Sequence, residues 1–413
     1  MKREDLLSKI SDPSKVWDVV VIGGGATGLG VAVDAVTRGY SVALFEWEDF
    51  AKATSSRSTK LVHGGVRYLA QGDVSLVLEA LYERGLLQQN APHLVKNQSF
   101  LIPNYRYWDN FLYTVGLTIY DILAGRLSLG RSKYVSKKKT TSYLPTVRVD
   151  GLKGGVVYHD GQFDDSRLAV NLAQSCVENG GCPINRMKVT AMLHGSDGRA
   201  RGVKVQDLMN GQEYEVKAKA VINATGIFVD SIMEMDVPTH EHMVKPSQGV
   251  HLVLDKSFLQ SDYAIMIPKT DDGRVLFAVP WHDKVVVGTT DTLREHPELE
   301  PQALESEIEF ILNTAGRYLT RKPQRSDVLS VFAGLRPLAA PKKEGKSTKE
   351  ISRSHKIFVS ENKLITITGG KWTTYRRMAE DTVDKAIELN LLEKKACAVS
   401  YTHLRAHETL ANL

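Results

Sequence analysis

The stretch from Val16 to Glu46 constrains the fold of this chain more than any other part of the sequence. Val16 to Val21 suits a buried strand and leads directly into the glycine-rich turn from Gly23 to Gly28. A helix is predicted from Leu29 to about Arg38, followed by a second strand from Ser41 to Phe45. The order of strand, turn, helix and strand predicts a dinucleotide-binding unit.

The glycine spacing in this turn fits a pyrophosphate group. Gly23, Gly25 and Gly28 form G-x-G-x-x-G, in which the first glycine permits the tight turn and the second lets the backbone approach a phosphate. The third lets the helix pack on the strand, and the helix N-terminus presents N–H groups and the positive end of its dipole. Glu46 is placed to accept hydrogen bonds from ribose hydroxyls and to disfavour a 2′-phosphate. The stretch therefore favours FAD or NAD over NADP.

Composition describes a globular protein larger than one small core. The 413 residues predict two domains or one elaborated domain, and the hydrophobic and charged fractions of 42% and 24% argue against disorder. The net charge of +5 suits an anionic substrate or membrane face but is too small to indicate nucleic acid. Cys176, Cys182 and Cys397 lack ligand spacing, which predicts a reducing compartment and no metal site.

The sequence predicts neither a cleaved leader nor a membrane span. Met1 to Lys15 is polar and contains acidic residues, unlike a secretory signal or a transit peptide. The least polar long run, from Phe111 to Tyr120, is too short to cross a bilayer.

An aromatic stretch between residues 101 and 139 carries an apolar helix face. Phe111, Val115, Ile119 and Leu123 recur every four residues, and the basic run from Lys137 to Lys139 follows. An apolar face beside a basic cluster is typical of a helix lying in a membrane interface. A helix that packs on its own domain fits the pattern equally well, so both interpretations stay open.

Five separated sequence blocks identify a family. They are VVVIGGGATG (19–28), TSSRSTKLVHGGVRYL (54–69), INATG (222–226), AGLRPL (333–338) and ITGGKWTTYR (367–376). In this order they resemble the FAD-dependent glycerol-3-phosphate dehydrogenases, quinone-linked membrane enzymes of bacteria and mitochondria. The resemblance runs from Val16 to about Leu392.

The resemblance implies an α/β fold with a Rossmann-type FAD-binding domain, as in glycine oxidase and D-amino-acid oxidase, and an antiparallel substrate-cap sheet. The FAD-binding domain is expected in residues 1–80, 150–235 and 328–392, and the cap with the membrane-facing part in 81–149 and 236–327. Residues 393–413 are expected to be a truncated stub of a further C-terminal domain with an atypical tail.

The implied activity is oxidation of sn-glycerol 3-phosphate to dihydroxyacetone phosphate by hydride transfer to FAD, with electrons passed to a quinone. The implied location is peripheral, on the inner face of a bacterial cell membrane or on the mitochondrial inner membrane in a eukaryote. A homodimer is left open. Three alternatives remain: a glycerol-3-phosphate oxidase that uses O2, an amine or amino-acid oxidase, and a truncated FAD-binding fragment without turnover.

The resemblance also assigns candidate catalytic residues. A dianionic phosphate needs Arg or Lys, and a hydroxyl proton at neutral pH suits histidine. Two histidines, His63 and His251, compete as the base, and Asp291 is expected either to bind substrate or to order its sheet. The candidates for the anion cage are Arg67, Arg336, Arg353 and Lys371, with Tyr68 as a hydroxyl donor.

The cofactor contacts are expected in the same five blocks and at two further positions, Glu46 and Val189. They are Gly23, Gly25, Ala26, Thr27, Gly28, Glu46, Thr54, Ser55, Ser56, Thr59, Lys60, Leu61, His63, Gly64, Gly65, Val189, Ala224, Thr225, Gly226, Gly334, Gly370, Lys371, Trp372 and Thr373. No metal is expected.

Overall fold

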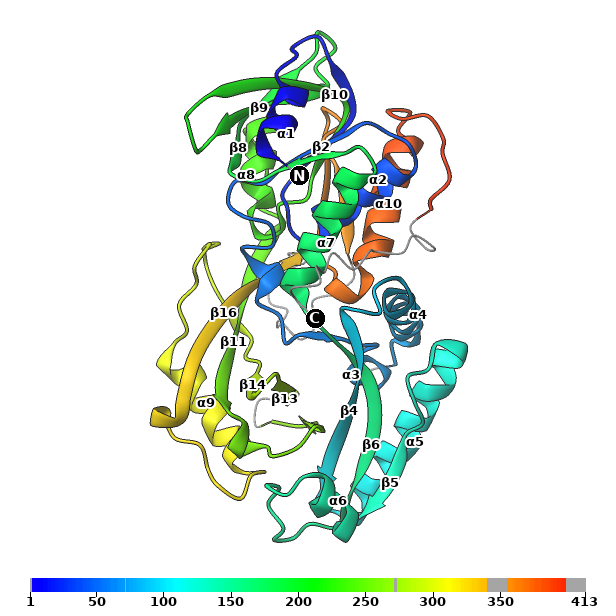
Figure 1. Ribbon diagram of the computed structural model, residues 1–413, viewed down its shortest axis with the longest axis vertical. Coiled ribbons are helices and arrows are strands. Elements are labelled where there is room, and N and C mark those ends of the chain that lie inside the picture. The colour runs from blue at the N-terminus through cyan, green and yellow to red at the C-terminus, as the bar shows by residue number, and fades with distance from the viewer. Residues whose placement is uncertain (1, 71, 271–272, 340–354, 399–413) are drawn as a thin grey trace.

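The computed structural model describes residues 2–70, 72–270, 273–339 and 355–398. These residues form two large sheets, which lie toward opposite ends of the long axis of the molecule (Figure 1). The predicted C-terminal tail lies outside the described residues from 399 onward. The α/β fold class expected from the sequence is confirmed.

Sheet A is built around β1 (Val16–Ile22). This strand pairs in parallel with β2 (Val42–Phe45) on one side and with β10 (Glu213–Asn223) on the other. Its inner residues are fully buried because parallel strands are covered on both faces. The remaining strands of sheet A in the described chain are β7 (Cys182–Ile184) beside β2, β18 (Ile365–Thr368) beside β10, β17 (Lys356–Val359), β8 (Met187–His194) and β9 (Ala200–Asp207).

Helices cover both faces of sheet A. On one face, α2 (Ala26–Thr37) packs between α7 (Asp165–Glu178) and α10 (Tyr375–Glu388). The opposite face carries α1 (Arg3–Ile10) and α8 (Val229–Asp236), whose buried residues join the core under the β8–β9 hairpin. The predicted strand–turn–helix–strand unit is confirmed, and α1 was not expected from the polar start of the chain.

Sheet B forms the other half of the molecule. Its strands, in spatial order, are β15 (Thr292–Leu293), β11 (Val244–Asp255), β14 (Lys284–Gly288), β13 (Leu276–Trp281), β12 (Ala264–Ile267), β4 (Val95–Asn104), β6 (Gly154–Phe163) and β3 (Leu61–Val62), with β16 (Val328–Ala339) along β11 and β5 (Lys133–Ser136) along β6. The pairing is antiparallel, as predicted, except between β12 and β4, which run parallel. These two strands come from distant segments that no hairpin connects, so an antiparallel turn does not dictate their direction.

Strands β6 and β16 pair within sheet B although the predicted boundaries assign residues 150–235 and 328–392 to the FAD-binding domain. The division of the chain into domains therefore stays a prediction at these edges.

In the described part of the chain, five helices flank sheet B. α9 (Glu305–Gly316) packs beside β11 and β13, and α6 (Lys137–Tyr143) packs on β5 and β6. α3 (Val66–Ala70), α4 (Val74–Asn90) and α5 (Tyr107–Ala124) contact one another beside β4 and β6 (Figure 1). Among the described residues, none of the helices combines the length and apolar character needed to cross a membrane.

Candidate functional site

A cavity of about 680 Å³ joins the two sheets. Its walls include Gly23 and Ala224, at the carboxyl ends of β1 and β10, and Met266 and Phe277 of sheet B. Ligands of open α/β sheets bind at the carboxyl ends of the strands, so the cavity lies where the fold predicts a cofactor.

The glycine turn forms one end of this cavity with the geometry expected for a pyrophosphate cradle. Gly23 has a φ of +103°, and a Cβ atom on Gly28 would lie 1.9 Å from the Gly23 carbonyl oxygen. The first backbone hydrogen bond of α2 runs from the Leu29 N–H to the Gly25 carbonyl, 3.0 Å away. The preceding N–H groups of α2 therefore have no carbonyl partner within the helix, which is the usual anion site of such a turn.

Glu46 at the end of β2 supports the turn before it meets any ligand. Its two carboxylate oxygens accept hydrogen bonds from the N–H groups of Gly24, at 2.7 Å, and Glu48, at 2.8 Å. Burial raises the pKa of this carboxyl, and the two N–H groups act against that rise. A carboxylate has about four acceptor positions, so positions remain for ribose hydroxyls in the cavity that Glu46 lines.

Arg336 on β16 projects into the cavity in a fixed orientation. Its Nη1 donates to the Thr290 carbonyl and its Nη2 to the Thr289 hydroxyl, each at 3.1 Å, and Asp291 Oδ1 lies 3.7 Å from Nη1. A Cβ on Gly249 of β11 would lie 2.4 Å from Nη2, so a glycine there makes room for the guanidinium. Asp291 lines the cavity and accepts a hydrogen bond from the Ser247 hydroxyl of β11, and both roles expected for it stay predictions.

His251 on β11 is a buried imidazole in the same wall. Its Nε2 lies 2.9 Å from the Thr59 hydroxyl oxygen, and its ring stacks on Phe332 with centroids 4.8 Å apart. Burial, with the positive charges of Arg336 and Lys60, lowers the pKa of His251 to about 3. The imidazole is therefore neutral at physiological pH.

Segments far apart in the sequence meet on the remaining wall. Lys371 Nζ lies 4.1 Å from the centroid of the Tyr68 ring, and the His63 N–H donates to the Thr373 hydroxyl at 3.2 Å. The indole N–H of Trp372 donates to the Ser55 carbonyl at 2.7 Å. These contacts join the block at residues 54–69 to the block at residues 367–376.

The predicted site residues converge on this cavity with six exceptions. Gly28, Ser56, Lys60 and Gly64 do not line it; Lys60, for example, bonds both carboxylate oxygens of Asp165. The side chain of Arg67 and the whole of Arg353 lie outside the described part of the chain. All other predicted catalytic and cofactor residues line the cavity.

Sequence reasoning missed the sheet B wall and one buried carboxylate. Phe100, Tyr158, Met266 and Phe277 line the cavity from β4, β6, β12 and β13, and Asp160 of β6 lines it as well. The continuous apolar runs of β12 and β13 indicate buried strands but not which of their side chains meet a ligand.

Comparisons with known proteins agree with this geometry. Residues 18–376 match the family model described as FAD dependent oxidoreductase. The chain is 43% identical over 410 residues to the mitochondrial glycerol-3-phosphate dehydrogenase of Schizosaccharomyces pombe, covering 94% of this chain and 63% of that protein. It is 45% identical over 395 residues to the mitochondrial glycerol-3-phosphate dehydrogenase SDP6 of Arabidopsis thaliana, covering 93% and 62%.

A crystal structure shows the same relationship. The glycerol-3-phosphate dehydrogenase of Bacillus halodurans complexed with FAD superposes with a TM-score of 0.78 at 34% identity, covering 98% of this chain and 70% of that one. The chain thus spans less than two thirds of the length of the two curated relatives and somewhat more of the crystallised one. With the family model matching most of its length, the chain belongs to the FAD-dependent oxidoreductase family, within the group of glycerol-3-phosphate dehydrogenases.

Proposed function

We propose that this protein oxidises sn-glycerol 3-phosphate to dihydroxyacetone phosphate with bound FAD and passes the electrons to a membrane quinone. The observation that carries the proposal is one cavity that holds the glycine turn, a neutral buried imidazole, and the cations of Arg336 and Lys371. The names of the relatives, all glycerol-3-phosphate dehydrogenases, support the choice of substrate.

The cavity fits FAD at the end formed by the glycine turn. The N–H groups at the start of α2 would hold the pyrophosphate, and Glu46 would hold the ribose with its remaining acceptor positions. Bound FAD supplies the hydride acceptor for the substrate C2. The protein must therefore orient the substrate, bind its phosphate and take up its hydroxyl proton.

Arg336 and Lys371 are proposed to bind the phosphate. Arg336 offers a guanidinium whose direction is set by Thr289 and Thr290, which lowers the entropy lost on binding. An exposed basic residue lacks this orientation, so the fixed fork favours Arg336 as the main phosphate contact.

His251 is proposed as the base, in preference to His63. Its Nδ1 is buried and has no hydrogen-bond partner among the described residues, whereas its Nε2 lies against the hydroxyl of Thr59, which lines the cavity, so Nε2 is the ring nitrogen placed to take up the hydroxyl proton. A pKa of about 3 is too low for an efficient base at neutral pH. A phosphate dianion beside Arg336 offsets the positive charge that helps to depress this pKa, so substrate binding should raise it.

A membrane surface is the proposed partner of α5. Trp108, Phe111 and Ile122 are 67%, 60% and 71% exposed, and α6, which begins with three lysines, packs on the same strands, β5 and β6, as α5 does. Exposed aromatic and aliphatic side chains beside lysines are typical of a helix in a lipid interface. We expect Phe111→Asp to weaken binding to anionic phospholipid vesicles at least tenfold, while Met209→Asp, at an exposed apolar residue of the sheet A half, leaves it unchanged. If the wild-type protein does not bind the vesicles, the result would favour the alternative of an O2-dependent oxidase.

Turnover of glycerol 3-phosphate with an artificial electron acceptor tests the activity itself. Removing a fixed charge from an anion site costs about 2–5 kcal/mol, so Arg336→Ala should lower kcat/KM by about 30-fold or more. Arg321→Ala, at an exposed residue, should leave kcat/KM unchanged. A wild-type protein that retains FAD but shows no turnover would instead support the fragment without activity.

A further inference from the structure

At the cavity wall lies a buried polar cluster that the proposed chemistry does not use. Asp160 of β6, Tyr120 of α5 and Arg84 of α4 are 2%, 1% and 1% exposed. Arg84 Nη1 donates to Asp160 Oδ1 at 2.6 Å, and the Tyr120 hydroxyl donates to Asp160 Oδ2 at 2.8 Å. Arg84 Nη2 also donates to the Leu127 carbonyl at 3.2 Å. Three separate elements of the fold therefore fix the position of one phenol oxygen.

The Tyr120 hydroxyl oxygen also accepts a hydrogen bond from the turn formed by residues 63–65, at the edge of the cavity. The Gly64 N–H donates to the Tyr120 hydroxyl at 2.7 Å. The preceding N–H, of His63, donates to the Thr373 hydroxyl at 3.2 Å. Two consecutive backbone donors of the turn are thus held by hydroxyls from positions 56 and 310 residues away in the sequence.

The turn has little freedom to settle elsewhere. Gly65 has a φ of +79°, and a Cβ on Gly64 would lie 2.5 Å from the Tyr120 hydroxyl and 2.6 Å from Leu81. His63 and Gly65 both line the cavity, and α3 with Tyr68 follows directly. Any shift of this backbone would move His63 and Tyr68 relative to a bound cofactor.

We propose that Tyr120, anchored by the Arg84–Asp160 ion pair, is a positioning residue that holds the His63–Gly65 turn against the bound FAD. The Arg84–Asp160 ion pair holds the Tyr120 hydroxyl in place through its hydrogen bond to Asp160. The hydroxyl in turn holds the Gly64 N–H, and with it the backbone between His63 and Gly65 at the edge of the cavity. Burial raises the pKa of Tyr120 well above its usual value, and the charge of Asp160 adds to the rise. The phenol therefore stays protonated and donates a hydrogen bond to Asp160.

The test uses the full chain loaded with FAD and compares Tyr120→Phe with Tyr113→Phe. Both changes remove one phenol oxygen from α5, but Tyr113 packs against the apolar cluster around Leu117. We expect Tyr120→Phe to bind FAD and to alter the visible circular dichroism of the flavin, which reports the asymmetry of its surroundings. Tyr113→Phe should keep the wild-type spectrum.

A kinetic readout adds to the spectrum and rests on the proposed function. We expect Tyr120→Phe to lower kcat for glycerol 3-phosphate by about 10- to 100-fold, because a misplaced reacting geometry costs this much. The KM should change by less than about twofold, since Arg336 is untouched. The circular dichroism needs no turnover, so an inactive wild type would refute the proposed substrate and still leave the positioning role to be judged by the spectrum.

Gly64→Ala disturbs the contact between Gly64 and Tyr120 from the side of the turn. It is the second test if Tyr120→Phe does not fold. Its Cβ must displace the Tyr120 hydroxyl or Leu81, so it should alter the flavin spectrum in the same way. Wild-type flavin circular dichroism in a folded Tyr120→Phe protein, or in Gly64→Ala where the first variant fails to fold, would overturn the proposal.

Discussion

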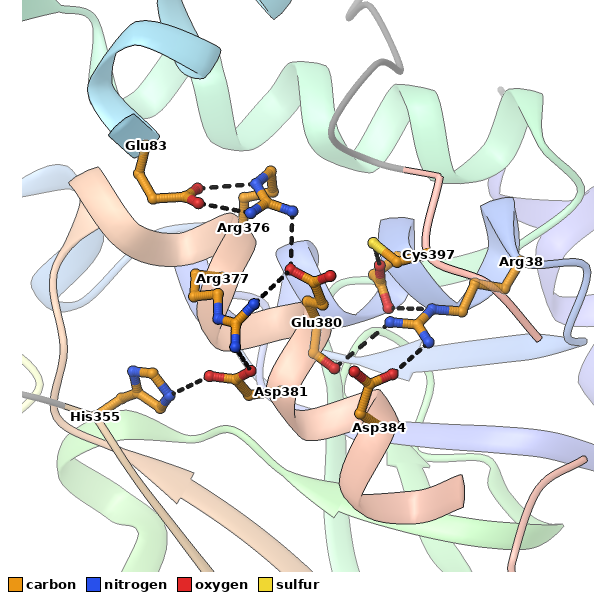
Figure 2. A network of polar contacts seen from close by, with 10 residues as sticks. Arg38, Glu83, His355, Arg376, Arg377, Glu380, Asp381, Asp384 and Cys397 are labelled. Carbon is orange, nitrogen blue, oxygen red and sulfur yellow. Dashed lines mark hydrogen bonds and ion pairs between the residues drawn. The ribbon is translucent and has the colours of Figure 1, made fainter. Parts of the chain in front are cut away.

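The buried ion pair between α4 and α10 offers the sharpest test of what holds the two halves of the molecule together. Figure 2 shows Glu83 of α4 facing Arg376 of α10, the last residue of the ITGGKWTTYR block. Arg376 Nε and Nη2 donate to the two carboxylate oxygens of Glu83 at 2.8 and 2.5 Å. The side chains of Glu83 and Arg376 are 2% and 7% exposed. This bidentate geometry with little solvent makes the pair sensitive to the loss of either partner.

Glu83→Gln should be strongly destabilising. Breaking a buried pair by removing one charge typically costs about 3–5 kcal/mol, because the remaining charge stays buried. Arg376 Nη1 also donates to Glu380 Oε2 at 3.1 Å, so the guanidinium keeps one acidic partner (Figure 2). The expected loss is therefore at the lower end, about 3 kcal/mol, which is a large part of the usual stability of a folded domain.

Urea unfolding at a fixed excess of FAD measures this loss as a lower midpoint with an unchanged slope. Glu388→Gln is the matched control on α10, the helix that carries Arg376, where the pair with Lys385 is exposed and worth under about 1 kcal/mol. If Glu83→Gln lowers the midpoint no more than Glu388→Gln does, the buried pair does not hold α4 to α10 as described.

Two further predictions concern the cavity. The pKa of His251, lowered to about 3, means that the unfolded chain binds the proton first, so stability should fall by up to about 1.4 kcal/mol per pH unit below pH 6.5. His251→Asn should flatten this fall between pH 7 and 5 in urea titrations, and an equal fall in the variant would contradict the burial of a neutral imidazole. Gly28→Ala places a Cβ 1.9 Å from the Gly23 carbonyl and should lose FAD on gel filtration. Gly116→Ala, where a Cβ meets nothing within 4 Å, should retain it; retention by both would refute the cradle.

Local patterns in the sequence predicted much of the fold. The apolar run before Gly23 and the glycine ending the helix place β1 and α2 to within a few residues, because strand and helix periodicity depend on neighbouring residues. About half of the residues that line the cavity lie in the five sequence blocks, for a related reason. Glycines and small hydroxyl residues are typical of backbone that approaches a ligand, because their small size and conformational freedom do not depend on tertiary contacts.

Contacts between distant segments were beyond sequence reasoning. Nothing local to Tyr120 indicates a bond to Gly64, because the contact depends on how α5 packs on β6. The acceptor role of Glu46 toward Gly24 and the parallel pairing of β4 with β12 depend on tertiary packing in the same way. The sequence pattern around Phe111 could not tell whether the apolar face of the helix is covered by the rest of the chain, and in the structure Phe111 on this face is exposed.

The visible spectrum of the purified protein, recorded under anaerobic conditions before and after addition of sn-glycerol 3-phosphate, tests directly whether bound FAD oxidises this substrate. We expect a flavin spectrum whose long-wavelength band bleaches when substrate is added to the wild type and persists in Arg336→Ala. A bound flavin that stays oxidised in the wild type would contradict the proposed substrate, and a colourless protein would contradict the assignment of the cavity to FAD.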